Sequence, residues 1–424
     1  MQKAEVFFRK LVSDSKNGDG VAICSVCSSN ELVLEAALEE GIRNNRYVLI
    51  EATANQVNQY GGYTGMTPDR YFLWVSALAN RIGLAPERLI LGGDHLGPLT
   101  WSKLPADEAM DKAEQLVRAY AGAGFQKLHI DCSMHLGGDN KNIPLPVELA
   151  AQRTVRLVKA AEESTNFTPV YVIGSEVPAP GGAVREEEPP QVTDPQDLQN
   201  EYEIFHREFT RHGLENAWNR VIAIVAQPGV EFGDNQLFIY NRMEARRLIE
   251  VSHSLPGIVL EGHSTDYQPS EALQSMREDG IAILKVGPAL TFSLRRALFA
   301  LEEIEKSMYP SAPVIGYSEF SDTLEMEMIS DQRFWQNHYR GDNETVALMR
   351  KYSLSDRCRY YFERPAVRNA IQRLFLNIDA KNVPCGLVYQ YFPEQAEKII
   401  SGKMCRQARA IAKEQVCNVL RRYE

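Results

Sequence analysis

Short apolar runs alternate with segments of helical spacing along most of the chain. The runs cover residues 21–27, 47–53, 89–94, 127–133, 170–176, 221–227, 258–263 and 281–287. Between them, as in residues 31–42 and 106–124, apolar residues recur every three to four positions, which is typical of amphipathic helices. Apolar strands that alternate with helices are typical of a parallel sheet covered on both faces. Eight such units predict a closed (β/α)₈ barrel, a TIM barrel of the α/β class.

The alternative arrangement of the same elements is an open, doubly wound sheet. That fold expects a Gly-x-Gly-x-x-Gly turn after its first strand, whereas this chain has Ser28, Ser29 and Asn30 there. After residue 306 the strand rhythm gives way to helical patterns rich in aromatic and charged residues. We therefore expect a barrel over residues 1–306 and a helical C-terminal extension over residues 307–424 that packs on it.

Composition and charge narrow the classes of protein that the chain can represent. Hydrophobic residues make up 44% and charged residues 24%, an ordinary globular composition, and no window approaches the ~18 apolar residues of a membrane span. The net charge is −10 with both signs scattered, which excludes a clustered nucleic-acid footprint. The N-terminal segment does not have the pattern of a secretory signal, and seven cysteines are an odd number for a disulfide framework. We therefore expect the chain in the cytoplasm.

Nearly every predicted strand turns polar at its C-terminal end. In a barrel these ends converge on one mouth, where the active site lies. For any single residue a satisfied buried polar group or a helix cap is an ordinary explanation, but polar residues at every end favour a functional site. These residues are Ser25, Glu51, Asp94, His95, Asp131, Glu176, Gln227, Glu261, His263 and Lys285.

Histidines and carboxylates without a paired thiolate motif suit a divalent metal ion of the Zn, Mn or Ni type, held by nitrogen and oxygen ligands. We expect His95 and His263 to be ligands, with Asp131 and Glu176 as carboxylate ligands or as partners that orient them. The position of His129 stays open, because its strand parity points it into the barrel below Asp131. The candidates for general acid or base are Asp94, then Glu261, Asp266 and Glu176.

Two basic groups have alternative interpretations. Lys285 either binds a phosphate or carboxylate beside the Gly287-Pro288 turn or forms a Schiff base. Arg357, with Arg359, either clamps a phosphate or belongs to a charged helix start. The expected substrate-binding residues are Ser25, Glu51, Asn55, Gln227, Lys285 and Arg357.

Loops around the mouth add two expectations. Residues 178–195, rich in proline, glycine and acids, follow the fifth strand and predict a long loop that could close as a lid. The glycine-rich turns match no nucleotide fingerprint, and no Gly-Lys-Ser/Thr loop is present, which disfavours a kinase.

Eight segments resemble the GatZ/KbaZ family of tagatose-bisphosphate aldolase Z-type subunits, some members of which are tagatose-6-phosphate 4-epimerases. The resemblance to class II aldolases is more distant. It implies that Asp94 is an acid or base and His95 a zinc ligand, and that Gly262-His263-Ser264 is a second ligand segment. Class II aldolases carry a further metal-binding histidine. This chain has no obvious equivalent, because its corresponding stretch offers Glu176. The eight segments are 51–68, 89–98, 127–134, 172–182, 221–232, 261–268, 283–292 and 352–361.

The resemblance implies two functions of different classes. The first is an isomerase, a metal-dependent ketose 4-epimerase that interconverts D-tagatose 6-phosphate and D-fructose 6-phosphate, or the free sugars, by retro-aldol cleavage and recondensation. The alternative is a non-catalytic subunit that stabilises a class II D-tagatose-1,6-bisphosphate aldolase. A stabilising subunit would predict apolar replacements at the mouth, whereas this chain keeps its polar residues, which favours the epimerase. The expected partners are a sugar or sugar phosphate and either a second copy of the chain or an aldolase subunit, with no membrane.

Overall fold

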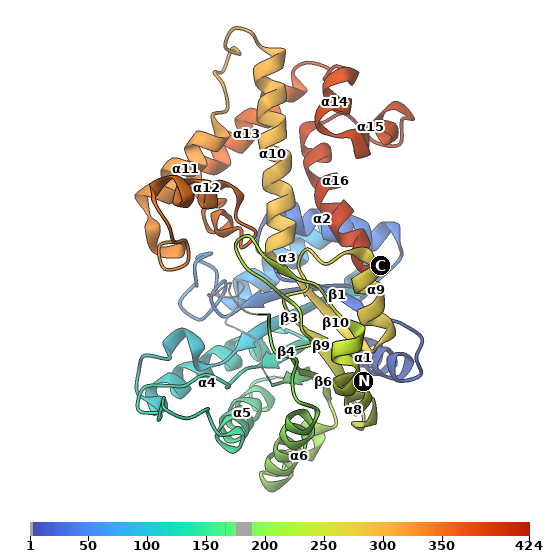
Figure 1. Ribbon diagram of the computed structural model, residues 1–424, viewed down its shortest axis with the longest axis vertical. Helices are drawn as coiled ribbons and strands as arrows, with labels where there is room; N and C mark the ends of the chain where they lie inside the picture. Colours follow the sequence, from blue (N-terminus) through green and yellow to red (C-terminus); the bar gives the residue numbers. More distant parts are fainter. Residues whose placement is uncertain (1–2, 166, 175–188) are drawn as a thin grey trace.

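The computed structural model describes residues 3–165, 167–174 and 189–424 (Figure 1). Eight parallel strands close into a barrel in the order β1-β10-β9-β6-β5-β4-β3-β2, which confirms the expected (β/α)₈ fold. The strands are β1 (Ile23–Val26), β2 (Val48–Thr53), β3 (Leu89–Leu96), β4 (Lys127–Ile130), β5 (Val170–Ile173), β6 (Val221–Val225), β9 (Val259–Gly262) and β10 (Ile281–Val286). A short hairpin of β7 (Glu231–Phe232) and β8 (Leu237–Phe238) follows β6.

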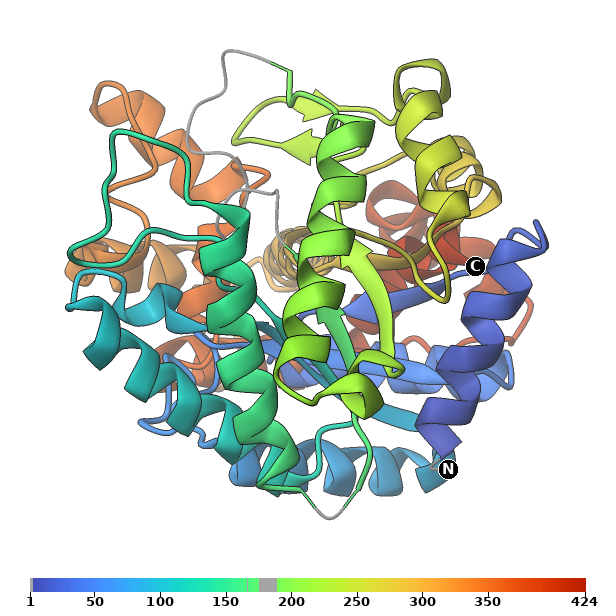
Figure 2. The same cartoon turned by 90° about the horizontal axis from the view of Figure 1, so that it is seen from below.

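Helices surround the barrel on the outside, as Figure 2 shows from below. Their ends follow local chemistry: Asn30, where an open sheet would need a glycine turn, accepts hydrogen bonds from two backbone N–H groups at the start of α2. Gly83 and Gly124 end α3 and α4 in the left-handed conformation. The helices are α2 (Glu31–Arg43), α3 (Pro68–Ile82), α4 (Ala106–Ala123), α5 (Val147–Glu162), α6 (Pro195–Arg211), α7 (Glu215–Trp218), α8 (Arg242–Ser254) and α9 (Ser270–Glu278), with 3₁₀ turns η1 (Pro86–Arg88) and η2 (Pro98–Trp101).

The amino ends of the strands are sealed by α1 (Lys3–Lys16). Phe8 and Leu11 of this helix join one buried cluster with barrel residues such as Leu49, Ile90 and Ile283. The helix therefore buries its apolar stripe against the barrel.

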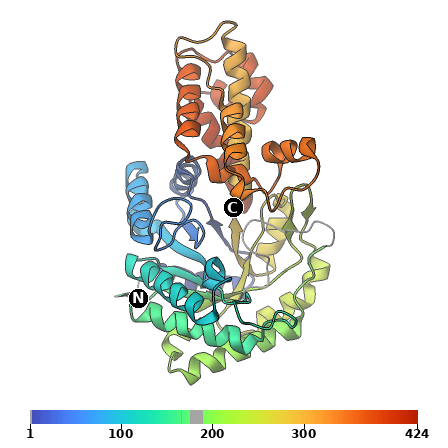
Figure 3. The ribbon, with the colours of Figure 1, turned by 90° about the vertical axis from the view of Figure 1, so that its left-hand side faces the viewer.

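The helices of the C-terminal extension form an elongated bundle that projects from the barrel, most clearly in Figure 3. The helix α10 (Pro288–Met308) follows β10 and runs into this extension, so residue 306 lies within its last turn, and the division into parts at 306 and 307 stays a prediction. None of the described helices is long and apolar enough to cross a membrane. The remaining elements are α11 (Phe320–Ser330), η3 (Gln332–Phe334), α12 (Asn343–Tyr352), η4 (Arg357–Tyr361), α13 (Pro365–Asp379), α14 (Cys385–Tyr391), α15 (Pro393–Ile400), α16 (Ala408–Leu420) and η5 (Arg421–Tyr423).

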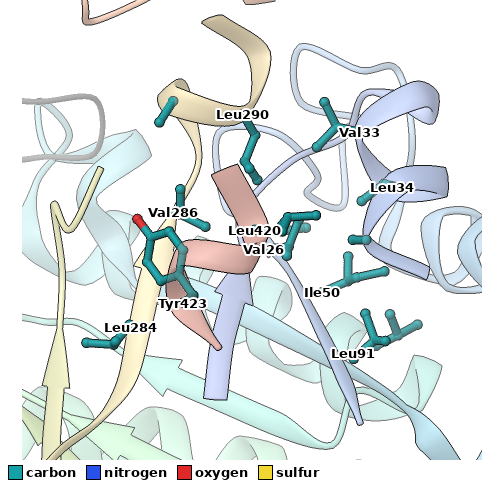
Figure 4. Packing of buried hydrophobic residues seen from close by; sticks show 14 of the residues in the cluster. Val26, Val33, Leu34, Ile50, Leu91, Leu284, Val286, Leu290, Leu420 and Tyr423 are labelled. Carbon is teal, nitrogen blue, oxygen red and sulfur yellow. The ribbon is translucent and has the colours of Figure 1, made fainter. Parts of the chain in front are cut away.

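The last helix of the extension returns to the barrel. It packs along α2 and α10, and η5 packs against α9. Figure 4 shows Leu420 and Tyr423 lying among side chains of the first and last barrel strands. Burial of this apolar surface holds the extension on the barrel, since each fully buried large side chain contributes about 1.5–3 kcal/mol.

Candidate active site

Two lysines and three carboxylates form a buried network inside the C-terminal end of the barrel. The Nζ of Lys285 lies 2.9 Å from Glu261 Oε1 and 3.2 Å from Glu51 Oε2, and it also contacts Asp94. The Nζ of Lys127 lies 2.6 Å from Glu51 Oε1 and 2.7 Å from Glu261 Oε2. Ser25 joins the network by donating to Glu51 Oε2 at 2.8 Å. Because burial removes water, these groups depend on one another for compensation of charge.

The electrostatics of this network favour the charged forms. Burial opposes the ammonium of Lys285, but the charges of Asp94, Glu261 and Glu51 outweigh it and raise its pKa well above the ordinary value. Burial likewise opposes ionisation of Asp94, yet Lys285 and His95 hold its pKa well below the usual range. A charged lysine is a poor nucleophile, so the arrangement disfavours the Schiff-base alternative for Lys285.

Three histidines lie beside this network. The rings of His95, His129 and His263 pack edge to face, with centroids 4.8 to 5.2 Å apart. Together with Asp94 they each offer a ligand atom, and these atoms all lie within 4.8 Å of one another. His129 is therefore the third histidine of the cluster, on a strand where the sequence left its role open.

Asp131 orients His95 and is not itself among the clustered ligand atoms. Its Oδ2 lies 2.8 Å from His95 Nδ1, and its Oδ1 accepts hydrogen bonds from the backbone N–H and the hydroxyl of Ser133 at 3.0 and 2.7 Å. This contact leaves His95 Nε2 open toward the cluster. A carboxylate behind a histidine is the usual way in which proteins orient a metal ligand.

The other two histidines, His263 and His129, differ in the contacts that their ring nitrogens make. Nε2 of His263 lies 3.0 Å from Glu261 Oε1, and burial with the nearby Lys285 lowers the pKa of His263 to about 3, so the ring is neutral and Nδ1 keeps its lone pair. His129 Nε2 lies 2.9 Å from the Gly174 carbonyl oxygen, and its Nδ1 lies 2.9 Å from Asp94 Oδ1. The donor set of histidine nitrogens and a carboxylate fits a divalent metal ion of the zinc or manganese type.

Strained backbone occurs around these residues. His95 has φ +46° and lies where the register between β3 and β4 shifts. Ser264, next to His263, has φ +52°, and Tyr267 has φ +62°. Left-handed residues other than glycine cost on the order of 1–3 kcal/mol each, so the surrounding packing must hold them. The bulge and the left-handed turn aim the two histidines at the cluster.

Glycine is required at two positions because other atoms lie too close for a side chain. A Cβ at Gly92 would lie 2.4 Å from Glu51 Oε1. A Cβ at Gly97 would lie 1.8 Å from the carbonyl oxygen of Asp131. The glycines around the Asp94–His95 pair therefore allow the neighbouring strands and the Glu51 carboxylate to approach.

Three residues predicted for the site lie outside the cluster and instead hold the loops around it. Asp266 Oδ1 accepts from the backbone N–H groups of Gly287 at 3.0 Å and Ala289 at 2.7 Å, at the start of α10. Gln227 Oε1 accepts backbone hydrogen bonds within its own loop. Asn55 is exposed and accepts from Thr100.

Glu176 lies outside the described residues, and so does most of the loop predicted as a lid, since residues 175–188 are not described. The structure therefore gives no position for Glu176 as a ligand or as an acid or base.

Part of the extension covers the rim of the mouth. The carbonyl of Leu354 accepts from Tyr267 at 2.6 Å, and its N–H donates to Asp234 at 2.9 Å. The rings of Tyr360 and Tyr63 lie 4.8 Å apart. The segment 353–361 therefore contacts the loops that follow β2, β6 and β9, as the clamp interpretation requires.

Arg357 of this segment is buried and only partly satisfied. One terminal nitrogen donates to the carbonyl of Phe334 at 3.0 Å, while Nε has no hydrogen-bond partner among the described residues. Arg359 is committed to the backbone of its own segment and to the hydroxyl of Tyr360.

Sequence reasoning missed two buried ionisable residues, one inside the barrel and one in the hairpin that follows β6. Lys127 is fully buried and has the same strand parity as His129 and Asp131, so parity could have identified it. Glu231 is buried in the β7–β8 hairpin, and burial raises its pKa to about 7. A loop residue carries no periodicity, so no sequence signal identified Glu231.

Comparisons with known proteins find relatives over most of the chain. The family described as D-tagatose-1,6-bisphosphate aldolase subunit GatZ/KbaZ-like matches residues 8–424. Proteins named D-tagatose-1,6-bisphosphate aldolase subunit GatZ from Escherichia coli (strain SMS-3-5 / SECEC) and Shigella flexneri serotype 5b are both 42% identical, over 98% of each chain. A crystal structure from Sinorhizobium meliloti 1021, described as a probable tagatose 6 phosphate kinase, is 40% identical with a TM-score of 0.87 and covers 95% of this chain and 99% of its own.

These relatives overturn one expectation. The prediction of an isomerase, a ketose 4-epimerase, is wrong, because the relatives are named as subunits of an aldolase, an enzyme that cleaves a carbon–carbon bond. The epimerase prediction was based on the activity of some family members. The polar residues at the mouth, which favoured that prediction, are equally compatible with aldol chemistry.

Proposed function

Because the chain belongs to the D-tagatose-1,6-bisphosphate aldolase subunit GatZ/KbaZ-like family, we propose that it is a subunit of such an aldolase and stabilises a separate catalytic chain. The observation that carries the stabilising role is the position of Lys285. Its ammonium contacts Asp94 and lies between Glu51 and Glu261, so a lysine of the chain itself offsets part of the negative charge of these three carboxylates. A carboxylate held in this way is not poised to exchange protons with a substrate.

A second candidate is that the mouth itself performs metal-dependent aldol cleavage. It is favoured by the clustering of His95, His129, His263 and Asp94 and by the support that Asp131 gives to His95. The three histidines would hold a divalent metal ion, which would supply Lewis-acid stabilisation of the oxygen at C2 of the ketose, and Asp94 would stay available as the base. Asp94 would take the proton of the C4 hydroxyl as the C3–C4 bond breaks, after release from Lys285. Arg357 would bind a phosphate through Nε, which has no hydrogen-bond partner in the part of the chain that the structure describes.

One experiment distinguishes the two candidates. The purified chain, a purified catalytic D-tagatose-1,6-bisphosphate aldolase chain and their mixture are assayed for cleavage of D-tagatose 1,6-bisphosphate with zinc or manganese present. The stabilising role predicts no cleavage by this chain alone, and a slower heat inactivation of the catalytic chain in the mixture. Cleavage by this chain alone, lost in Asp94→Asn and kept in the exposed control Asp107→Asn, would support the second candidate instead. If the chain neither cleaves nor protects, both candidates fail.

A further inference from the structure

A cavity of about 530 Å³ lies on the outside of the barrel, away from the mouth. Its walls come from α1, β1, α2, the residues that lead into β2, and the C-terminal end of the chain. Ile23, Cys24 and Val26 of β1 line the cavity, whereas Ser25 is not part of its wall and reaches Glu51 inside the barrel. The cavity is therefore distinct from the histidine cluster.

The origin of the cavity is the path of the chain after β10. The helix α10 runs into the extension, and the outer face of β1 is covered by Leu420 and Tyr423 from the end of the chain (Figure 4). Below these residues the wall is completed by Phe7 and Leu11 of α1 and by Val48. Most of this wall is apolar, so it offers a hydrophobic surface to the body of a small molecule.

Two arginines at the cavity lack a carboxylate partner. No ion pair among the described residues includes Arg46 or Arg277, and the buried Nε of Arg277 has no hydrogen-bond partner there. Burial and the nearby Arg46 lower the pKa of Arg277, and the charge of Glu278 only partly opposes this shift, so the two arginines lie close enough to affect each other. Paired guanidinium groups with free N–H donors are suited to a carboxylate or phosphate.

The acidic residues of the cavity are already engaged. Asp14 pairs with Lys10 at 2.6 Å, Glu40 is held by Arg421 at 2.9 Å, and the Glu424 side chain accepts from Asn44 at 2.5 Å. Asp14 and Glu40 are therefore neutralised by cations, whereas Glu424 is hydrogen-bonded to a neutral amide and keeps its charge. Arg46 and Arg277 are the basic residues of the wall without an ion-pair partner among the described residues.

We propose that this cavity binds an amphipathic anion, a small molecule with an apolar body and a carboxylate or phosphate head. The apolar body lies against Phe7, Leu11 and Tyr423, and the head is held by Arg46 and Arg277. A volume of about 530 Å³ is within the range of about 300–1,000 Å³ typical of small-molecule sites. The proposal does not depend on the role of the chain as an aldolase subunit.

The test compares four probes by isothermal titration calorimetry with the full-length chain. Octanoate and octyl phosphate carry both features, octanol carries only the apolar body, and inorganic phosphate carries only the head. We expect one of the two amphipathic anions, or both, to bind at least tenfold more tightly than octanol and than inorganic phosphate, and the stronger of the two identifies the head group. Octanol binding as tightly as the anions would overturn the proposal, and so would the absence of binding by both anions.

Variants locate the binding site. Arg277→Gln should weaken the anion about tenfold to a hundredfold, the usual effect of losing a hydrogen bond to a charged group. The control Arg207→Gln, an exposed arginine on α6, should leave binding unchanged. Ala22→Phe, which places a ring in the cavity, should abolish binding, and circular dichroism establishes that each variant is folded. Equal loss in Arg207→Gln, or unchanged binding in both cavity variants, places the ligand elsewhere and contradicts the proposal.

Discussion

Single residues at the barrel centre are stabilised by compensation of charge. Lys127 is fully buried and bridges Glu51 and Glu261, both of which are fully buried as well. Replacing the whole set of buried charges by apolar side chains would change the stability little. Removing one partner alone is costly, because it leaves a buried charge without compensation. The consequences of a substitution here therefore depend on which charge remains.

We expect Lys127→Met to lower the free energy of unfolding by about 3–5 kcal/mol, because two buried carboxylates lose one of the two cations that they share. Urea unfolding followed by circular dichroism measures this loss. The exposed control Lys103→Met should stay within about 0.5 kcal/mol of the natural chain. A loss of less than about 1 kcal/mol in Lys127→Met would mean that the network relaxes or takes up protons.

Glu231 should make stability depend on pH. Burial raises its pKa in the folded chain from 4.5 to about 7. Between these values the folded chain binds more protons than the unfolded chain, so this contribution to stability is present at low pH and is lost as the pH rises through the window. In Glu231→Gln the contribution is absent, while Oε1 can still accept from the N–H of Phe232.

The measurement is the free energy of unfolding of both chains from about pH 4 to about pH 8. Relative to Glu231→Gln, the natural chain should lose up to about 3 kcal/mol across this range. Parallel profiles for the two chains would show that Glu231 does not titrate in the window.

At the scale of elements, one ion pair joins the extension to the barrel's last helix. Arg295 of α10 donates through Nε to Asp356 Oδ1 at 2.8 Å, and the hydroxyl of Thr291 donates to Asp356 Oδ2 at 2.6 Å. Asp356 precedes η4 and has φ +46°. This contact holds the segment 353–361 over the rim of the mouth.

We expect Arg295→Met to destabilise the chain by about 3–5 kcal/mol, because Asp356 is left as an unpaired buried charge. The double variant Arg295→Met/Asp356→Asn should recover part of this loss, since asparagine is neutral, tolerates the left-handed conformation and still accepts from Thr291. Thermal unfolding of the single and double variants tests the prediction. If the double variant is no more stable than the single one, loss of packing rather than charge is responsible.

At the scale of the whole molecule, three different strands bring the histidines together. His95 lies on β3, His129 lies on β4 and His263 follows β9. A divalent metal bound there would link these elements and stabilise the folded chain by mass action.

We expect the purified chain to retain about one zinc or manganese ion, and His95→Ala to lose it, because both the ligand and the contact with Asp131 disappear. Elemental analysis measures the metal content, and a chelator should lower the Tm of the natural chain but not of His95→Ala. The exposed histidine in His253→Ala provides the control and should keep the metal. Equal metal content in the natural chain and in His95→Ala would place the ion elsewhere.

The sequence by itself determined the barrel, because local periodicity carries the alternation of buried strands and amphipathic helices. It also placed Asp94, Glu261 and Lys285 at one mouth, since parallel strand ends must converge in a closed sheet. The parity of β4 put His129 and Asp131 on the same face. These inferences need only the period of each element and the closure of the sheet.

Only the tertiary structure decided which of these polar residues touch. Lys285, near the end of β10, is surrounded by carboxylates, whereas Asp266, which follows β9, caps α10. The register and the loops set which atoms come within bonding distance. The placement of segment 353–361 at the mouth and the cavity beside Arg277 arise from the path of the extension, and no local pattern encodes that path. Contacts between residues distant in sequence depend on packing, which periodicity does not specify.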